Sequence, residues 1–94
     1  MADGAQSTTE VHRQFVSEPM AQKPVTKLSG IGPISGAKLT EAGYGKAFKV
    51  FGQFLVLNKE EERFIEWLKE TAGTNTRCAE DCYNCVREWN DKNF

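Results

Sequence analysis

The sequence has no apolar run close to the roughly 20 residues that a membrane-spanning helix needs, and its first residues show no charged-then-apolar signal pattern. Only three cysteines, three prolines and one histidine occur among the 94 residues. We therefore expect free thiols rather than a disulfide framework, no membrane insertion, and a chain that stays in the nucleus and cytoplasm. Walker loops, nucleophile elbows and H-E-x-x-H motifs are also missing, so the sequence predicts neither an enzyme nor a bound cofactor.

The net charge is small, formally −1, but the charges are unevenly distributed along the chain. Residues 1–59 contain seven Lys and Arg against four Asp and Glu, whereas residues 60–94 contain five against nine. This asymmetry allows one basic face on an acidic protein, with chance segregation of solvated charges as the alternative. A chain of this length predicts one small domain, which self-association would help to stabilise.

Two glycines flank Ile31 between two predicted helical segments, residues 25–28 and 33–42. Glycine tolerates positive φ and Pro33 suits the first position of a helix, so this stretch predicts a sharp corner that leads into a helix. We expect Ile31 to anchor the corner in the core. The apolar residues of the second helix are also expected to face the core: Ile34, Leu39 and Ala42.

The same corner predicts an anion site. The amides of Gly30, Gly32 and Ile34 would gather at the positive end of a helix, with Lys38 downstream. This arrangement is typical of a helix-hairpin-helix motif, which holds a nucleic-acid phosphate through main-chain donors. A helix–helix turn that binds nothing is the alternative. We expect Glu at Gly30 or Gly32 to abolish DNA binding and to leave the fold intact.

Apolar periodicity predicts an all-α fold of five to six helices, with further helices near residues 10–16, 47–57, 59–72 and 78–91. Residues 1–10 are expected to form a flexible tail and residues 11–94 a single helical domain. Asn58 and Glu61 resemble a capping box for the helix 59–72. Gly43 and Gly73 suit left-handed positions that close the helices before them.

The segment 47–57 is apolar over more than one face, although an amphipathic pattern directs one set inward: Ala47, Val50, Phe51, Phe54 and Leu55. So small a domain cannot bury all of this segment. Gly52 in the middle costs about 1 kcal/mol relative to Ala, which close approach of another backbone would explain. The segment predicts a dimer seam or a partner groove, with ordinary core as the alternative.

Cys78, Cys82, Cys85 and Trp89 form one stripe of the last predicted helix. Three thiols on one helix face lack the paired ligand spacing of structural zinc sites, and His12 is the single histidine that remains. We therefore expect no metal site and assign the stripe to core packing, because cysteine is often buried as a small hydrophobe.

Taken together, the chain from His12 to Phe94 resembles the barrier-to-autointegration factor family of small chromatin proteins. The stretches that carry the resemblance are His12-Arg13, Phe15-Val16, Glu18-Pro19-Met20, Lys23-Pro24-Val25, Leu28, Gly30-Ile31-Gly32, Gly52-Gln53-Phe54-Leu55-Val56-Leu57, Glu66-Trp67-Leu68-Lys69, Asp81-Cys82, Cys85 and Glu88-Trp89.

The resemblance implies a homodimer that binds and bridges double-stranded DNA without sequence preference. It also implies LEM-domain proteins, lamins and histones as partners, and roles in chromatin organisation and in assembly of the nuclear envelope. DNA contacts are expected at Arg13, Gly30, Ile31, Gly32, Ile34, Lys38, Asn75 and Arg77. The dimer or partner groove is expected at Phe51, Gly52, Phe54, Val56, Arg63 and Trp67. Phosphorylation is expected at Ser7, Thr8 and Thr9.

The chain departs from the family pattern at four positions. Basic residues are common in the family where this chain has Val11, Asn58 and Glu80, and an apolar residue is common at Arg63. Fewer cations near the phosphates should weaken DNA binding and flatten its dependence on salt. Two other functions stay open from sequence: a protein-interaction adaptor with weak or no DNA binding, and a DNA-repair enzyme.

Overall fold

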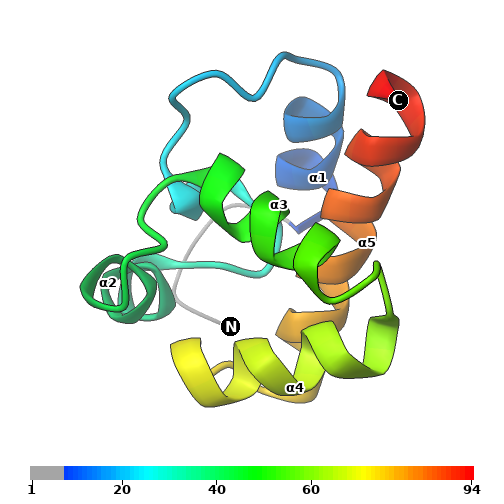
Figure 1. The fold of residues 1–94 in the computed structure, drawn as a ribbon. Helices are drawn as coiled ribbons and strands as arrows, with labels where there is room; N and C mark the ends of the chain where they lie inside the picture. Colours follow the sequence, from blue (N-terminus) through cyan, green and yellow to red (C-terminus); the bar gives the residue numbers. More distant parts are fainter. Residues whose placement is uncertain (1–7) are drawn as a thin grey trace.

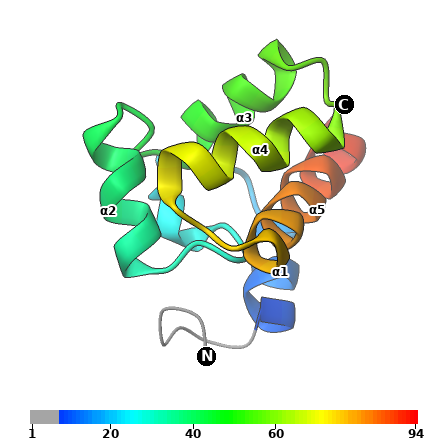
Figure 2. The same ribbon diagram turned by 90° about the horizontal axis from the view of Figure 1, so that it is seen from below.

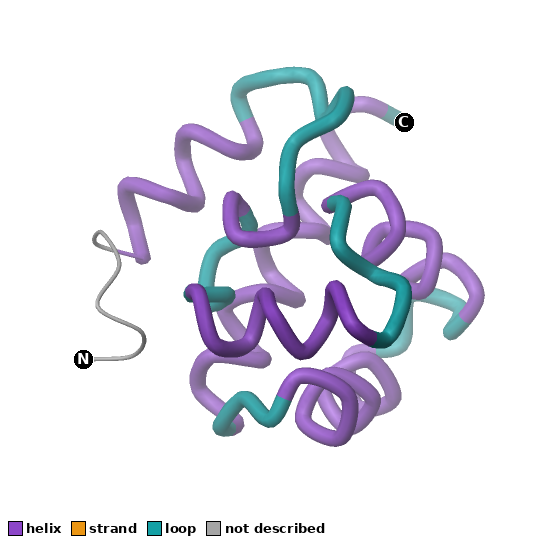
Figure 3. The backbone as a smooth tube through the Cα atoms, turned by 90° about the vertical axis from the view of Figure 1, so that its left-hand side faces the viewer, coloured by secondary structure: helices purple, strands orange, loops and turns teal. Residues whose placement is uncertain are grey.

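The computed structural model describes residues 8–94, with side chains from residue 10 onward. Over that range the chain is helical, and Pro24 and Lys46 share a single isolated β-bridge (Figures 1 and 3). The elements are α1 (Thr8–Val16), the short 3-10 helix η2 (Val25–Lys27), α2 (Pro33–Glu41), α3 (Ala47–Val56), α4 (Glu61–Ala72) and α5 (Thr76–Asn93). The predicted all-α class is therefore confirmed. None of the described helices is long and apolar enough to cross a membrane.

The longest helix, α5, is the element against which both α1 and α4 pack (Figures 1 and 2). Its inner stripe consists of the three predicted cysteines, all buried and unbridged. Burial raises the pKa of the Cys82 thiol well above its ordinary value and raises that of Cys85 to about 12. The thiols therefore serve as core side chains. The described residues contain no cluster of three or more metal-ligating side chains.

The core around α5 consists largely of aromatic rings. Phe54 and Phe64 meet edge to face with centroids 6.0 Å apart, and Tyr83 contacts both rings. Phe15 and Val16 are buried on the inner side of α1. Aromatic pairs of this kind add to the free energy that burial of their area contributes.

Two polar contacts hold α1 and the segment after it against the second half of α5. His12 Nε2 and Glu88 Oε1 are 2.7 Å apart, and Trp89 Nε1 donates to the carbonyl of Glu18 over 3.0 Å. The hydrogen bond with His12 is the main reason why the pKa of Glu88 lies below its ordinary value. These contacts join residues that are more than 70 positions apart in the sequence.

The start of α4 differs from the sequence prediction. The capping box at Asn58 is wrong: Glu60 is the N-cap, no side chain caps the helix, and both Asn58 and Lys59 have positive φ. The Tyr83 hydroxyl donates to the carbonyl of Lys59 over 2.8 Å, so a buried residue of α5 holds this left-handed turn. Sequence spacing could not reveal a partner 24 residues away.

Three apolar residues predicted to face inward are exposed instead. Ile34 is 66 % exposed, Leu55 is 43 % exposed, and Ala42 lies on the surface at the end of α2. Leu39 is fully buried as expected. The last helix also begins at Thr76, two residues earlier than predicted, because Asn75 caps it by accepting the Cys78 amide over 2.8 Å. Gly43 and Gly73 have the predicted positive φ.

Candidate nucleic-acid interface

The predicted corner joins η2 to α2 through residues 29–32. The Leu28 amide donates to the Val25 carbonyl, and the Ile31 amide donates to the Leu28 carbonyl over 3.1 Å, so two overlapping turns form the bend. Gly30 has a φ of +86°, which L side chains rarely adopt. Ile31 is 2 % exposed and anchors the corner in the core, as predicted.

The N-terminus of α2 faces the surface without a capping side chain. Gly32 is the N-cap, Pro33 occupies the first turn, and the Gly32 carbonyl accepts the Gly36 amide over 2.8 Å. The Ile34 amide belongs to the first turn, where no intrahelical acceptor is available. The Ile34 side chain is exposed, whereas Gly32, the residue two positions earlier, is buried.

The corner rests directly on the first turn of α5. A Cβ atom at Gly30 would clash with the carbonyl oxygen of Cys78 and would lie 3.3 Å from the Cβ of Asp81. Figure 2 shows the segment that leads into α2 passing beside the start of α5. The expectation that Glu at Gly30 would leave the fold intact is therefore wrong, because any side chain there displaces the backbone of α5.

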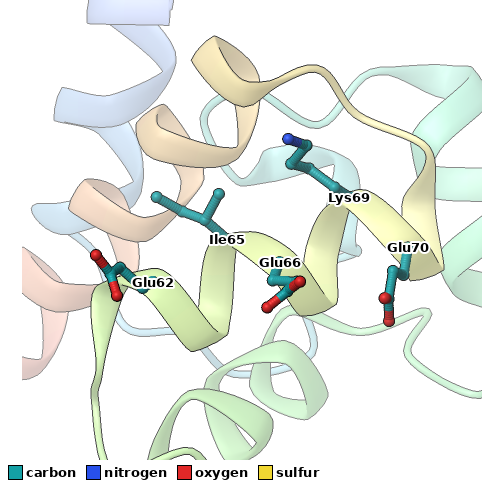
Figure 4. A pocket seen from close by; sticks show the side chains of 5 residues that line it. All are labelled: Glu62, Ile65, Glu66, Lys69 and Glu70. Atoms are coloured by element: carbon teal, nitrogen blue, oxygen red, sulfur yellow. The ribbon is translucent and has the colours of Figure 1, made fainter.

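This contact brings the loop between α4 and α5 beside the corner, with cations from three helices. A Cβ built on Gly73 in this loop would lie 2.9 Å from the Nζ atom of Lys38. Lys69 Nζ donates to Thr76 Oγ1 over 3.1 Å, and Figure 4 shows that Lys69 leaves α4 on the side of α5. Arg77 is exposed in the first turn of α5.

None of these three cations takes part in an ion pair of the described residues. The ion pairs lie elsewhere, joining Lys23 to Glu18, Arg63 to Glu60, Arg87 to Asp91, and Lys92 and His12 to Glu88. We define Lys38, Lys69 and Arg77, together with the corner and the first turn of α5, as the hairpin surface. Two helix N-termini and three such cations favour an anion there. Lys69 was missed from sequence because its partner is Thr76, across a loop.

The hairpin surface also carries two carboxylates. Asp81 is half-buried behind Gly30, and Glu80 is exposed one residue earlier on α5. Their charges oppose an incoming phosphate and lower the net positive charge of the surface. Asn75 is already engaged as the cap of α5 through its side-chain oxygen.

Arg13 lies apart from the hairpin surface. It lines a shallow groove between α1 and the end of α5, together with Glu88 and Lys92. Cys78 and Glu88 are ten residues apart on α5, which corresponds to about 15 Å along the helix. The structure therefore places this predicted DNA contact at a separate position.

The residues predicted to line the dimer or partner groove differ in their burial and lie on different helices. Phe54 is fully buried in the core, so its assignment to a groove is wrong. Phe51 is 8 % exposed under Trp89 and Phe94, whereas Val56 is 72 % exposed. Arg63 and Trp67 lie on α4, where Arg63 is exposed and Trp67 packs edge-on against Tyr44. The predicted phosphorylation sites, Ser7 and the side chains of Thr8 and Thr9, lie outside the described residues.

Comparisons with known proteins agree with this architecture. The family model described as barrier to autointegration factor matches residues 6–93. The chain is 54 % identical over 85 residues to Barrier-to-autointegration factor of Homo sapiens, covering 90 % of this chain and 96 % of that protein. It is 55 % identical over 86 residues to Barrier-to-autointegration factor 1 of Caenorhabditis elegans, covering 92 % and 97 %. The protein from Danio rerio is 55 % identical over 85 residues, covering 90 % and 94 %.

The chain belongs to the barrier-to-autointegration factor family. The resemblance seen in the sequence is thereby confirmed over almost its whole length. Membership in the barrier-to-autointegration factor family supports a chromatin-associated function of the same type.

Proposed function

We propose that the protein is a homodimer that binds and bridges double-stranded DNA without sequence preference. Its sites of action are the nucleus, the nuclear envelope and the cytoplasm, where it organises chromatin and takes part in assembly of the envelope. Its protein partners are LEM-domain proteins, lamins and histones. It performs no catalysis.

The observation that carries the DNA-binding proposal is the seating of the hairpin corner on α5. This contact gathers two helix N-termini and the cations of Lys38, Lys69 and Arg77 on one surface. Main-chain amides and lysines recognise phosphates and carry no information about base identity. The expected binding is therefore independent of sequence and sensitive to salt.

Dimerisation is supported by α3. Its outer face exposes Phe48, Leu55 and Val56, and a Cβ at Gly52 would meet no atom within 4 Å. Nothing in the described part of the subunit requires a glycine in the middle of this helix. Exposed apolar patches on a small protein mark interaction sites, and a second subunit with its own hairpin surface would allow two duplexes to be joined.

The test combines gel shift with sedimentation. Wild-type protein should shift random duplexes of equal length equally, and a mixture of two labelled duplexes should be co-precipitated. Gly52→Glu would place a carboxylate in the apolar contact, where desolvation costs several kcal/mol. We expect monomers that shift one duplex and no longer join two. A strong preference for one sequence, or an unchanged dimer mass for Gly52→Glu, would contradict the proposal.

A second candidate function is supported by Glu80 and Asp81. These carboxylates at the hairpin surface favour an adaptor that binds proteins and has little affinity for DNA. The variant Glu80→Gln discriminates between the two functions, with Glu41→Gln as a control at the exposed end of α2. For the DNA-binding function, removal of one repulsive charge should tighten binding and steepen its dependence on salt. An adaptor would show no shift with either protein.

A further inference from the structure

The surface around η2 carries positive charge that the hairpin surface does not include. The segment 19–59 contains six lysines and a single carboxylate. Lys23 pairs with Glu18 over 2.6 Å, whereas Lys27 and Lys46 are exposed and take part in no ion pair of the described residues. Two cations of this surface therefore lack a counter-charge in that part of the chain.

Backbone contacts hold the segments of these two lysines side by side. Pro24 and Lys46 form the isolated antiparallel bridge, in which paired Cα atoms lie about 5 Å apart. The Lys27 amide donates to the Pro24 carbonyl over 3.0 Å, and residues three apart lie on the same side of a 3-10 helix. Lys27 therefore lies on the side of η2 that pairs with Lys46. We define Lys27 and Lys46 as the η2 lysines.

The fold fixes the η2 lysines close together without neutralising them. Cations on one surface repel each other, and an anion beside both of them relieves the repulsion. Each of the two side chains is exposed, so neither lysine is needed to fill the core. The arrangement suits an anionic ligand from outside the subunit.

η2 leads directly into the hairpin corner. Lys27 precedes Gly30 by three residues, which limits the distance between their Cα atoms to about 10 Å. η2 and the loop before α3 lie above α2, on the face turned to the viewer in Figure 3. The path from Gly30 past Lys27 to Lys46 is about 20 Å long, and duplex DNA carries about one phosphate charge per 1.7 Å of its axis. A duplex held at the corner thus offers many phosphates within this range.

We infer that the η2 lysines bind the phosphate backbone of the duplex that the hairpin surface holds, at phosphates flanking the one at the corner. The inference rests on the proposed DNA-binding function and adds a second region of contact to it. Lysines recognise phosphate charge and carry no information about base identity, so these contacts preserve binding without sequence preference.

Lys49 does not belong to this second region. It precedes Gly52 by three residues and Val56 by seven, so it lies on the outer face of α3 with them. Lys46 is the N-cap of that helix and has extended backbone geometry, through which it pairs with η2 instead.

The test uses two duplexes of equal length and fluorescence anisotropy over a salt series. One duplex is fully charged, and in the other the flanking phosphates are replaced by neutral methylphosphonates. For the fully charged duplex, Lys27→Gln and Lys46→Gln should each reduce the slope of log affinity against log salt by about 0.9. Their difference in affinity from wild type should accordingly shrink about 3- to 4-fold between 50 and 200 mM salt. For the duplex with neutral flanks, both variants should bind like wild type.

Lys59→Gln is the matched control. Lys59 is also exposed and forms no ion pair among the described residues, but it follows α3 at the end opposite Lys46. Its replacement removes the same charge and should leave the affinity for both duplexes unchanged. Circular dichroism of the three variants checks that each retains its helices.

Equal affinity of wild type, Lys27→Gln and Lys46→Gln for the fully charged duplex would overturn the inference. Equal weakening with both duplexes would overturn it as well, because the lysines would then act at the phosphate of the corner itself. Both results leave DNA binding by the hairpin surface intact. A wild-type protein that binds neither duplex would instead remove the proposed function, and the inference with it, so the two failures are distinguishable.

Discussion

Gly30 and Gly52 occupy two surfaces of the molecule that use glycine for opposite reasons. Gly30 has positive φ, and a Cβ there would clash with the backbone of α5. Gly52 has ordinary helical geometry, and the space around it is empty in the isolated subunit. The hairpin surface therefore requires its glycine for the fold of the chain itself, whereas the outer face of α3 carries a glycine that the described part of the subunit does not require.

The two surfaces also differ in their chemistry. The hairpin surface combines helix N-termini with cations that form no ion pair among the described residues, and the exposed apolar side chain of Ile34 lies next to it in the sequence. The outer face of α3 is mainly apolar, with lysines at one end of the helix. A polyanion suits the first surface and a second apolar helix suits the second.

The largest effect is expected for Gly30→Ala. Left-handed backbone strain and overpacking against α5 should together lower the free energy of unfolding by about 3 kcal/mol or more. Gly43→Ala is the matched control, because Gly43 also has positive φ but a Cβ there meets no atom within 4 Å. Denaturant titration of both variants separates the steric clash with α5 from the strain of a left-handed backbone. Equal losses in the two would show that α5 yields to the new side chain.

Substitution of Lys38 should affect DNA binding, whereas substitution of Lys49 should affect dimerisation. Lys38→Gln should weaken binding to all duplexes and reduce the slope of log affinity against log salt by about 0.9, the value for one phosphate contact. Its dimer mass should not change. Lys49→Gln should weaken the dimer and preserve the salt slope for a short duplex that accommodates one subunit. Fluorescence anisotropy over a salt series measures the first effect and sedimentation the second. A weaker dimer for Lys38→Gln and a reduced salt slope for Lys49→Gln would contradict the assignment of the two surfaces.

The variant Gly52→Ala tests whether Gly52 serves the fold of the subunit or a contact outside it. Because the Cβ meets nothing within the subunit and alanine favours helix, the isolated subunit should gain about 1 kcal/mol. The dimer should weaken at the same time, since the added methyl group enters the apolar contact proposed between the subunits. Unfolding measured at low protein concentration reports the first effect, and sedimentation reports the second. Loss of subunit stability would indicate that α3 is packed more closely than the structure shows.

Thr74 lies in the loop between α4 and α5 and carries a buried polar group that lowers the free energy of unfolding. Its hydroxyl oxygen is buried and has no hydrogen-bond partner in the described part of the chain. Replacement of the hydroxyl by a methyl group in Thr74→Val should raise the free energy of unfolding by about 1 kcal/mol, because an unsatisfied buried group is removed. Thermal unfolding tests this, with Thr26→Val at an exposed position of η2 as the control. A destabilised Thr74→Val would indicate that the hydroxyl has a partner in solution.

The smallest effect is expected away from both surfaces, at the pair of His12 and Glu88. The pKa of Glu88 is lowered from 4.5 in the folded chain, so its contribution to stability is present above pH 4.5 and disappears as the pH falls through the lowered value. The difference in stability between wild type and Glu88→Gln should therefore vanish in acid. Glu80→Gln, at an exposed carboxylate that forms no ion pair among the described residues, is the control for the loss of one surface charge.

The sequence alone determined the helices, the hairpin corner, the buried stripe of cysteines and the family. These features follow from local rules, because apolar spacing, glycine conformation and proline position act over a few residues. Ile31, Leu39 and the three cysteines are buried as their spacing indicates. Gly32 is the N-cap of α2, as the predicted corner requires, whereas the anion site at the start of this helix stays a prediction.

Only the tertiary structure decided which surfaces these elements form. It seated Gly30 on the carbonyl of Cys78 and turned Lys69 toward Thr76. It also placed Arg13 in a groove beside Glu88, which lies ten residues after Cys78 on α5. It also buried Phe54 fully and left Val56 exposed on the same helix. Such outcomes depend on contacts between residues distant in sequence, where packing space rather than local preference selects the partner.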